Sequence, residues 1–531
     1  MLYRQKPFFN WSVAALSVVA VAALLIIFNG GISVGFSNHT GLMPVVRRIL
    51  NPDYLPNDFG IALRFYHHRV FAYLVAGASY VLGEDHALTA LHVVGMTLLS
   101  ASLFYLCRIA GIPLSGFVAV GLFVATNFAW AGMSLEENHF VGNRDIQPTT
   151  FAHALILFAV AGVIERRYTL VAFLAGVVML LHVQIGVIFT LLLIPFYLAE
   201  IKTFSVGDIL RFAILFFVPA SPSLSHFSHM MQKGLLDSSF ALYYVDFRHP
   251  HHFELMSAKH ALGVAGNLAA QVVAYIWLRR QRDYSIERRA VGVLLIICSL
   301  LAALALAHFV DYYLLRVGTV MKIQFIRLSS LITVFGALSV AATLNMWWKE
   351  RAARRAKSPS LNVAMASLLA AGMLWAAYSV AVAERDPRPS AAIRFYAEQK
   401  TGWVDVCRWV KDHGPRDTVY LTPPDTRGFA YLSDRSPIVE FKTNPDGGQY
   451  LTQWFERLRD LGGGTLPEAR GFRNGSLLNK AFASLDTDQI VALGEKYGAR
   501  YAVLPKASPA KLEAVYENDQ YRVVKIPGST G

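Results

Sequence analysis

The amino-acid sequence contains a succession of apolar segments, each about as long as a lipid bilayer is thick. The first extends from Trp11 to about Phe28, and others lie at roughly 88–107, 113–132, 149–164, 168–199, 208–222, 259–278, 290–309, 319–346 and 361–383. An α-helix needs about 20 mostly apolar residues to cross the hydrocarbon core. The sequence therefore predicts a polytopic α-helical membrane protein.

The composition also indicates a membrane protein, and it changes how the net charge is interpreted. Of the 531 residues, 54% are hydrophobic and 16% are charged, and the mean hydropathy is +0.40. A formal net charge of +13 would indicate nucleic acid as the partner of a soluble protein. Here the Lys and Arg residues cluster between apolar segments, a pattern that orients helices in a membrane. We expect membrane lipid as a partner and no nucleic acid.

The number of spans depends on the 168–199 segment, whose length fits either one long helix or two short ones bent at His182. If it crosses twice, the main basic clusters all fall on one side, as positive-inside topology requires. These clusters are Arg108, 166–167, 279–289 and 349–357. We therefore predict about eleven spans in an inner membrane, with a cytoplasmic amino terminus and a periplasmic carboxyl terminus.

The chain changes character after Glu384. A Pro-containing linker at 386–389 precedes a mixture of expected helices (400–413 and 486–497) and expected strands (418–422, 438–441, 501–504 and 520–525). The sequence predicts two parts: a transmembrane domain over 1–384 and a soluble, extracytoplasmic α/β domain over 385–531. The soluble part has no Gly-rich nucleotide-binding motif.

The first outer segment, 30–87, has helical patterning and is too long for a simple hairpin loop. We predict two amphipathic interfacial helices joined by a turn that carries Asp53 and Asp58. A carboxylate at this surface could act as a general base toward an acceptor hydroxyl. The alternative is that both residues cap helices, since Asp is common at helix starts.

Polar residues also gather in the second outer loop, 135–148. Glu136, Glu137, His139 and Asp145 could hold a divalent cation, Mg²⁺ or Mn²⁺, or contact a sugar. Glu136 and Asp145 are the metal candidates, and Glu137 and His139 are candidates for substrate binding. The alternative is a solvated loop.

A third polar group lies at 243–254, where Arg248, His249, His251 and His252 occur within five residues. The spacing differs from that of helical zinc sites and Pro250 interrupts a helix, which favours a substrate or phosphate contact over a metal. Arg248 is the strongest candidate, since a guanidinium matches a phosphate in two-pronged geometry. His182, in the bend of the 168–199 segment, is a further candidate for donor binding.

Two cations, Lys322 and Arg327, lie at the outer end of the apolar segment 319–346. An Arg within such a segment should face the bundle interior or a wet cavity. On a continuous helix, Gln324 and Arg327 would share a face. A lipid phosphate is one partner for Arg327, and an internal salt bridge to Asp311 is the alternative.

Together these features resemble the glycosyltransferase C superfamily, membrane enzymes that use polyprenyl-phosphate sugars. The resemblance covers the whole architecture, and the 249–252 and 418–442 segments look like a bacterial, largely uncharacterised branch. The Trp-Trp-Asp-Tyr-Gly motif of oligosaccharyltransferases is absent, because Trp347 and Trp348 are followed by Lys.

The resemblance implies an inverting transfer to a glycan, lipid or protein acceptor outside the cell. The base would be Asp58, with Asp53 as the alternative, and Arg248, Lys322 and Arg327 would stabilise the departing phosphate. Two other classes stay open. One is a transporter or flippase for a lipid-linked glycan, although no repeat is visible. The other is a non-catalytic scaffold subunit.

Overall fold

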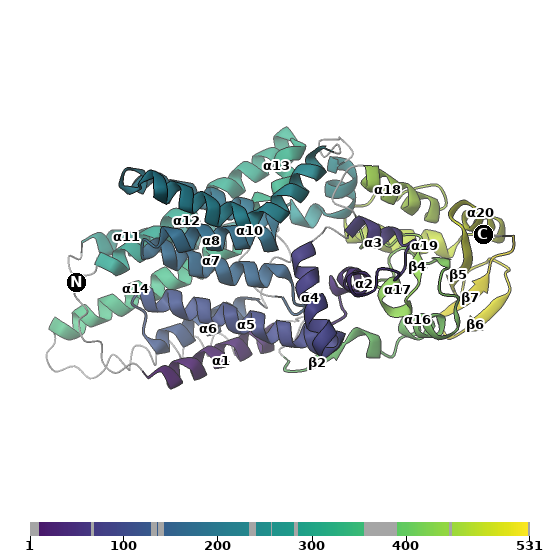
Figure 1. Ribbon diagram of the computed structural model, residues 1–531, viewed down its shortest axis with the longest axis horizontal. Coiled ribbons are helices and arrows are strands. Elements are labelled where there is room, and N and C mark those ends of the chain that lie inside the picture. Colours follow the sequence, from purple (N-terminus) through teal and green to yellow (C-terminus); the bar gives the residue numbers. More distant parts are fainter. Residues whose placement is uncertain are drawn as a thin grey trace.

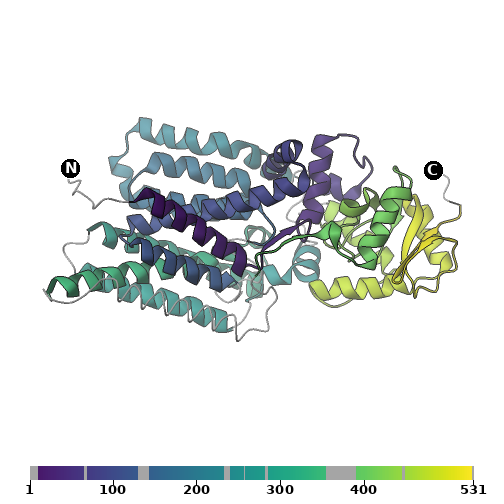
Figure 2. The same ribbon diagram turned by 90° about the horizontal axis from the view of Figure 1, so that it is seen from below.

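A computed structural model gives the structure of the chain and describes residues 10–64, 68–128, 135, 143–232, 240–255, 258–280, 285–354, 390–444 and 449–528. Figure 1 shows a helical bundle at one end of the long axis and a region containing a sheet at the other. Figure 2 shows the same division in a second view. We call the end of the bundle that meets this C-terminal region the domain end, and the opposite end the far end.

The bundle is built from long apolar helices. They are α1 (Trp11–Phe28), α5 (Glu84–Ile109), α6 (Leu114–Phe128), α7 (Pro148–Ile164), α8 (Tyr168–Leu181), α9 (Val183–Glu200), α10 (Val206–Gln232), α11 (Ala258–Arg279), α12 (Ser285–Val310) and α14 (Ser330–Arg354). In the described part of the chain, seven helical stretches are long and apolar enough to cross a membrane, namely those containing α1, α5, α9, α10, α11, α12 and α14. The expected span at 361–383 lies outside the described residues, so the total of about eleven stays a prediction.

The 168–199 segment folds as two antiparallel helices, α8 and α9. His182 between them has an extended backbone, and the Tyr197 hydroxyl at the end of α9 donates to the Tyr168 carbonyl at the start of α8 at 2.8 Å. A Cβ on Gly186 would lie 2.4 Å from the Met179 Cα, so the absence of a side chain permits this close approach. The expected bend at His182 is present, whereas α8, with 14 residues, is shorter than a typical span, so the two crossings stay a prediction.

Basic residues from several helices meet at the far end of the bundle. Arg166 lies 3.5 Å from Glu200, and Arg289 donates to the Ile164 carbonyl at 2.8 Å. Arg108 faces the Trp11 ring at the start of α1. The described basic clusters thus gather at the end opposite the C-terminal region, the distribution that the positive-inside rule requires of a cytoplasmic face.

The first outer segment forms three helices at the domain end instead of the two expected. They are α2 (His39–Leu50), α3 (Phe59–Arg64) and α4 (Arg69–Leu82), with the expected turn between α2 and α3. His68, the residue just before α4, has a φ of 50°, outside the right-handed helical range, so α4 begins after it. The short strand β1 (Ile32–Val34) pairs in parallel with β2 (Ile393–Phe395), which ties this segment to the C-terminal region.

The 319–346 segment is not one continuous helix. It contains α13 (Gly318–Ile323), the 3₁₀ turn η5 (Phe325–Leu328) and the start of α14. Gln324 between them has a φ of 53°, which residues with a side chain rarely adopt. The prediction that Gln324 and Arg327 share a helix face is therefore wrong. The other short turns are η1 (Ile201–Thr203), η2 (Phe240–Arg248), η3 (Pro250–His252), η4 (Asp311–Leu315) and η6 (Tyr396–Glu398).

The C-terminal region contains a five-stranded mixed sheet in the order β4-β3-β5-β7-β6. Its strands are β3 (Val419–Leu421), β4 (Ser436–Pro437), β5 (Ala499–Pro505), β6 (Ala514–Glu517) and β7 (Tyr521–Lys525). The expected strand at 438–441 is wrong, because the paired residues are the two before it. The other three expected strands are present.

Five helices pack around this sheet: α16 (Gly402–His413), α17 (Phe429–Ser433), α18 (Gln449–Leu461), α19 (Phe472–Ala483) and α20 (Thr487–Tyr497). A capping box of Asp486 and Gln489 begins α20. Trp454, Phe441 and Phe482 are fully buried in the core. The expected linker and the boundary at 384 lie outside the described residues.

Candidate functional site

Arg327 lies at the domain end of the bundle in a group that we call the Arg327 cluster, made of His182, Gln324 and Arg327. The Arg327 side chain is buried, with 9% of the residue exposed. Its Nε donates to the Gln324 Oε1, and its Nη1 lies 3.4 Å from the His182 Nε2. Both partners are uncharged when the imidazole is neutral, so the contacts that the described residues make with the Arg327 charge are dipolar.

Breaks between helices bring these three residues together. His182 occupies the hairpin between α8 and α9, and Gln324 and Arg327 occupy the break between α13 and α14. Gln184 at the start of α9 donates to the Lys322 carbonyl at 2.7 Å, which fastens the two breaks to each other. The His68 ring lies 4.7 Å from the His182 ring. Strained backbone concentrated in this way is typical of functional sites.

The salt bridge between Arg327 and Asp311 considered from the sequence does not form. Asp311 Oδ1 instead accepts a hydrogen bond of 2.8 Å from the Val317 N–H. Among the residues that the structure describes, no carboxylate forms an ion pair with Arg327. A buried guanidinium without a carboxylate partner is an environment that favours an anion such as phosphate.

Asp58 is buried where α3 meets the C-terminal region. Its Oδ1 accepts a hydrogen bond of 2.7 Å from the Ile61 N–H, as a helix cap does. Burial raises the pKa of Asp58 to about 6, although that N–H bond and the charge of Arg48 oppose the rise. It lines a small cavity together with Glu440 and Thr443. Asp58 thus carries out the capping role, and its raised pKa also suits a general base.

Asp53 occupies a different environment, although it belongs to the same turn. It is exposed, and its N–H donates to the Asn51 Oδ1 at 3.1 Å. In the described part of the chain, no hydrogen bond or ion pair joins Asp53 or Asp58 to the Arg327 cluster.

Asp145 lies just before α7, beside a histidine that the sequence did not single out. It is 6% exposed and accepts a hydrogen bond of 2.9 Å from Gln147. Burial lowers the pKa of His39 and the charge of Asp145 opposes this effect. His39 Nε2 lies 3.0 Å from the Ile146 carbonyl. His92 on α5 is buried, and its ring nitrogens make no hydrogen bond to the described residues.

Arg248 and the histidines after it contact the C-terminal region. Arg248 donates from Nε to the Phe441 carbonyl at 3.0 Å, and its guanidinium faces the Phe441 and Phe472 rings at 4.7 and 5.1 Å. His249 Nε2 lies 3.0 Å from the Asn444 Oδ1. These contacts hold Arg248 at the junction with the sheet region, among aromatic rings.

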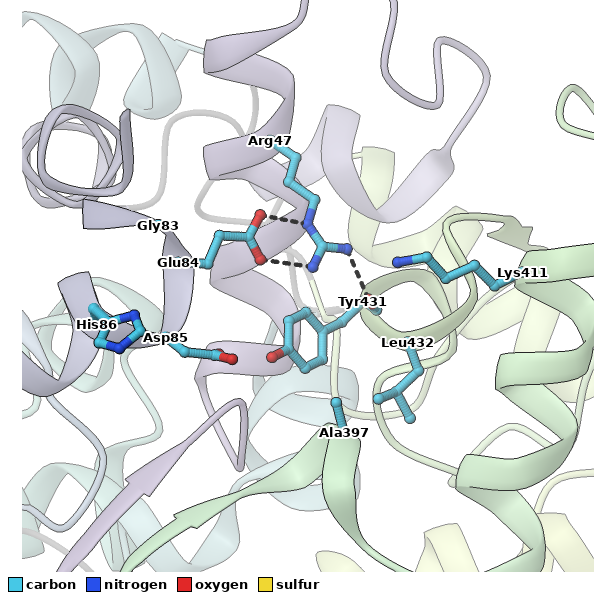
Figure 3. Close-up of a pocket in the computed structure, with 9 residues that line it drawn as sticks. All are labelled: Arg47, Gly83, Glu84, Asp85, His86, Ala397, Lys411, Tyr431 and Leu432. Carbon is cyan, nitrogen blue, oxygen red and sulfur yellow. Dashed lines mark hydrogen bonds and ion pairs between the residues drawn. The ribbon is translucent and has the colours of Figure 1, made fainter. Parts of the chain in front are cut away.

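A cavity of about 320 Å³ opens on the junction between the first outer segment and the C-terminal region (Figure 3). Arg47 lies on one side of it and donates two hydrogen bonds of 2.7 Å to Glu84. It also contacts Asp434 at 2.6 Å and the Tyr431 carbonyl at 2.7 Å. Although burial lowers the pKa of Arg47, the contacts with Glu84 raise it above its ordinary range. Carboxylates fully compensate this guanidinium.

The remaining sequence candidates, Glu136, Glu137 and His139, lie outside the described residues. From the sequence, no role was assigned to His39, His68 or His92. A signal for His68 was available, because it belongs to the same segment as Asp58, after the short helix α3. His39 and His92 gave none, since a single histidine in a helical segment is most often a packing residue.

Comparisons with known proteins give a family model that matches part of the chain and matches to solved structures. The model of a "Domain of unknown function (DUF6798)" matches residues 401–461, from α16 to α18. No curated protein matches the sequence of the chain.

Two solved structures are similar to the chain, each with a TM-score of 0.41. One is the archaeal oligosaccharyltransferase AglB from Archaeoglobus fulgidus, in complex with an inhibitory peptide and a dolichol-phosphate, at 12% identity over 93% of this chain and 70% of that chain. The other is ArnT from Cupriavidus metallidurans in the apo state, at 13% identity over 98% of this chain and 99% of that chain.

Proposed function

We propose that the chain is a membrane glycosyltransferase that moves a sugar from a polyprenyl-phosphate donor to an extracytoplasmic acceptor. The observation that carries the proposal is the buried Arg327, which has dipolar partners and no carboxylate in the described part of the chain. It lies at the domain end of the apolar bundle, where the phosphate of a membrane-anchored donor could enter from the lipid while its hydrocarbon chain stays outside.

The proposed reaction is a single displacement with inversion at the anomeric carbon. A carboxylate takes the proton of the acceptor hydroxyl, the oxygen bonds to the anomeric carbon, and the bond from that carbon to the phosphate oxygen breaks with its electrons going to the phosphate. Arg327 and Lys322 stabilise the charge that develops on the phosphate, with the His182 imidazole beside Arg327. Fixed cations in a site shielded from water suit this task.

The base belongs to the proposal, with three candidates on the domain face. Asp58 is the first candidate, because its pKa of about 6 lets it accept a proton near neutral pH. Asp53 is the exposed alternative from the same turn. The structure adds Asp145, which is buried beside His39. A divalent cation, Mg²⁺ or Mn²⁺, held by Asp145 and Glu136 belongs to the same proposal.

The proposed location is a bacterial inner membrane, with the far end of the bundle toward the cytoplasm and the C-terminal region in the periplasm. The arginines at the far end support this orientation. In this arrangement the donor approaches the Arg327 cluster from the outer leaflet, and the acceptor comes from the periplasm.

The test is a transfer assay with purified protein in detergent and radiolabelled sugars on polyprenyl phosphate, with and without EDTA. We expect the wild type to release the sugar from the lipid, and Arg327→Ala to lose this activity. One of Asp58→Asn, Asp53→Asn and Asp145→Asn should also lose it. Asp412→Asn, at an exposed position on α16, is the matched control and should keep it.

The result also separates the alternative functions. If the wild type binds the donor but transfers no sugar in the presence of a periplasmic extract containing acceptors, the transferase proposal fails. The transporter or scaffold function would then take its place.

A further inference from the structure

Three histidines around Pro250 bring their ring nitrogens to one point, independently of any role in sugar transfer. His249, His251 and His252 each offer a nitrogen, and the three atoms all lie within 4.8 Å of one another. The closest rings, those of His251 and His252, have centroids 4.2 Å apart. Three imidazoles packed together are unfavourable if they become charged, so the arrangement calls for a ligand or for a fixed neutral state.

A single turn of 3₁₀ helix produces this convergence. The turn η3 begins with Pro250, and the His252 N–H donates to the His249 carbonyl at 2.9 Å. With three residues per turn, positions i and i+3 eclipse. His249 and His252 accordingly stack, with centroids 5.1 Å apart and planes at 24°. From the sequence, a metal was disfavoured because the spacing of these histidines differs from that of zinc sites on α-helices. The turn is a 3₁₀ helix, so that comparison does not apply to it.

Side chains of the C-terminal region orient two of the rings. The Asn444 Oδ1 lies 3.0 Å from the His249 Nε2, so Nε2 is the donor and Nδ1 carries the free lone pair. The His249 Nδ1 is buried and makes no hydrogen bond to the described residues. The Phe472 ring stacks on His251 with centroids 4.5 Å apart. A partner that fixes the far nitrogen of a histidine is the usual outer support of a metal ligand.

The two acids of the same segment, Asp246 and Glu254, pair with arginines. Asp246 pairs with Arg316 and, at 2.9 Å, with Arg470. Glu254 pairs with Arg470 at 2.6 Å. The available ligands are therefore three nitrogens, a set that suits zinc and its neighbours in the first transition row better than Mg²⁺ or Mn²⁺.

We propose that His249, His251 and His252 form a transition-metal site of the zinc class, with three imidazole ligands and a fourth position for water or an anion. In tetrahedral zinc sites with Zn–N distances near 2.05 Å, ligand nitrogens are about 3.4 Å apart. The separations here are at most 4.8 Å, so rotations that move each nitrogen by about 1 Å close the site. The bound metal would fasten the segment after η2 against the C-terminal region through Asn444 and Phe472.

The experiment uses full-length protein purified in detergent through a tag without histidine, because a polyhistidine tag would bind the same metals. The protein is treated with chelator, desalted and titrated with Co²⁺ or Zn²⁺. We expect one equivalent to bind, with the visible absorption of tetrahedral Co²⁺ and an increase in unfolding temperature with Zn²⁺. His251→Gln and His252→Gln should each weaken binding at least tenfold and abolish the increase.

His413→Gln is the matched control, since His413 is an exposed histidine on α16. It should bind metal as the wild type does. The proposal is overturned if the wild type binds no equivalent after desalting, or if the His251 and His252 variants retain the stoichiometry and the Co²⁺ spectrum. A single variant that fails to fold leaves the other to decide, and the control tests for adventitious surface binding.

Discussion

Two arginines at the domain end of the molecule, the partly buried Arg47 and the buried Arg327, have opposite surroundings. Arg47 contacts carboxylates from two distant parts of the chain, with hydrogen bonds of 2.7 Å to Glu84 and an ion pair of 2.6 Å with Asp434. The Arg327 guanidinium contacts the side-chain oxygen Oε1 of Gln324 and the His182 ring. The first guanidinium is paired with acids of the protein, and the second has no described carboxylate partner.

The difference in partners indicates that Arg47 serves the stability of the fold and Arg327 serves the binding of an anion. A fully paired guanidinium holds α2 against the start of α5 and against the C-terminal region, and it has little capacity for another anion. A buried guanidinium whose described partners are dipoles and not carboxylates is only partly compensated for the loss of water, and an incoming phosphate would complete the compensation. Arg47 should therefore matter for stability, and Arg327 for binding and rate.

The largest expected effect is on transfer in Arg327→Gln. Removing the cation should lower the transfer rate by about 100-fold or more, because a fixed charge aimed at the leaving phosphate is lost. The unfolding temperature should stay the same or rise, because the variant no longer buries an unpaired charge. Rates from the radiolabel assay and thermal unfolding in detergent check both parts. An Arg327→Gln variant with a lower unfolding temperature but a normal transfer rate would contradict the assignment.

The next effect is on stability in Arg47→Met. This change leaves Glu84 without its cation and Asp434 with Lys411 alone. We expect a loss of about 2 kcal/mol, between the values for exposed pairs and for fully buried pairs that lose one partner. Thermal unfolding and limited proteolysis of the C-terminal region measure it.

Lys411→Met is the matched control for Arg47→Met, since Lys411 also pairs with Asp434 at 2.9 Å but is 47% exposed. Its loss should cost less than about 1 kcal/mol. Equal losses in the two variants would show that burial does not distinguish these two contacts.

A third effect concerns Asp58 and pH. The pKa of Asp58 rises from 3.8 to about 6 on folding. The protonated Asp58 carboxyl group thus contributes fully to the free energy of unfolding below about pH 4, and this contribution is lost as the pH rises through 6. Two pKa units correspond to about 3 kcal/mol. Asp58→Asn, which can still cap α3, should therefore gain in unfolding temperature relative to the wild type between pH 4.5 and 7.5. Parallel pH curves for the two proteins would contradict the raised pKa.

The smallest expected effect is in Asp486→Ala, far from both arginines. The variant removes the hydrogen bond of 2.9 Å from the Gln489 N–H at the start of α20. Loss of such a cap costs about 1 kcal/mol. Unfolding of the C-terminal region should shift by that amount while the transfer rate stays unchanged. A change in transfer rate would mean that activity depends on the stability of the sheet region. Stability and rate could then not be assigned separately to Arg47 and Arg327.

Features of the fold that depend on local pattern were predictable from the sequence. Apolar length located the bundle helices, and the positive charges favoured two helices for 168–199, as the α8–α9 hairpin has it. That both helices cross a membrane stays a prediction. The alternation of helices and strands predicted an α/β arrangement, and the structure has a sheet with helices around it and a helix ending at Tyr497. The strand at 438–441 was misplaced because a short buried apolar run looks the same whether or not it pairs.

The candidate site was harder to predict, because it depends on breaks and on long-range contacts. Nothing in the residue type of Gln324 signals a positive φ, yet that break puts the Gln324 side chain against Arg327. The pairing of Arg47 with Asp434 joins residues 387 positions apart. The convergence of His249 and His252 required a 3₁₀ turn in a segment whose Pro predicted only an interruption.

The most direct test of the contrast is the affinity of the purified protein for a polyprenyl phosphate, measured in detergent for the wild type, Arg327→Gln and Arg47→Gln at one salt concentration. We predict that Arg327→Gln weakens binding at least tenfold, whereas folded Arg47→Gln binds as the wild type does. Equal binding by the wild type and Arg327→Gln, or a loss confined to Arg47→Gln, would contradict the assignment of Arg327 to the donor phosphate.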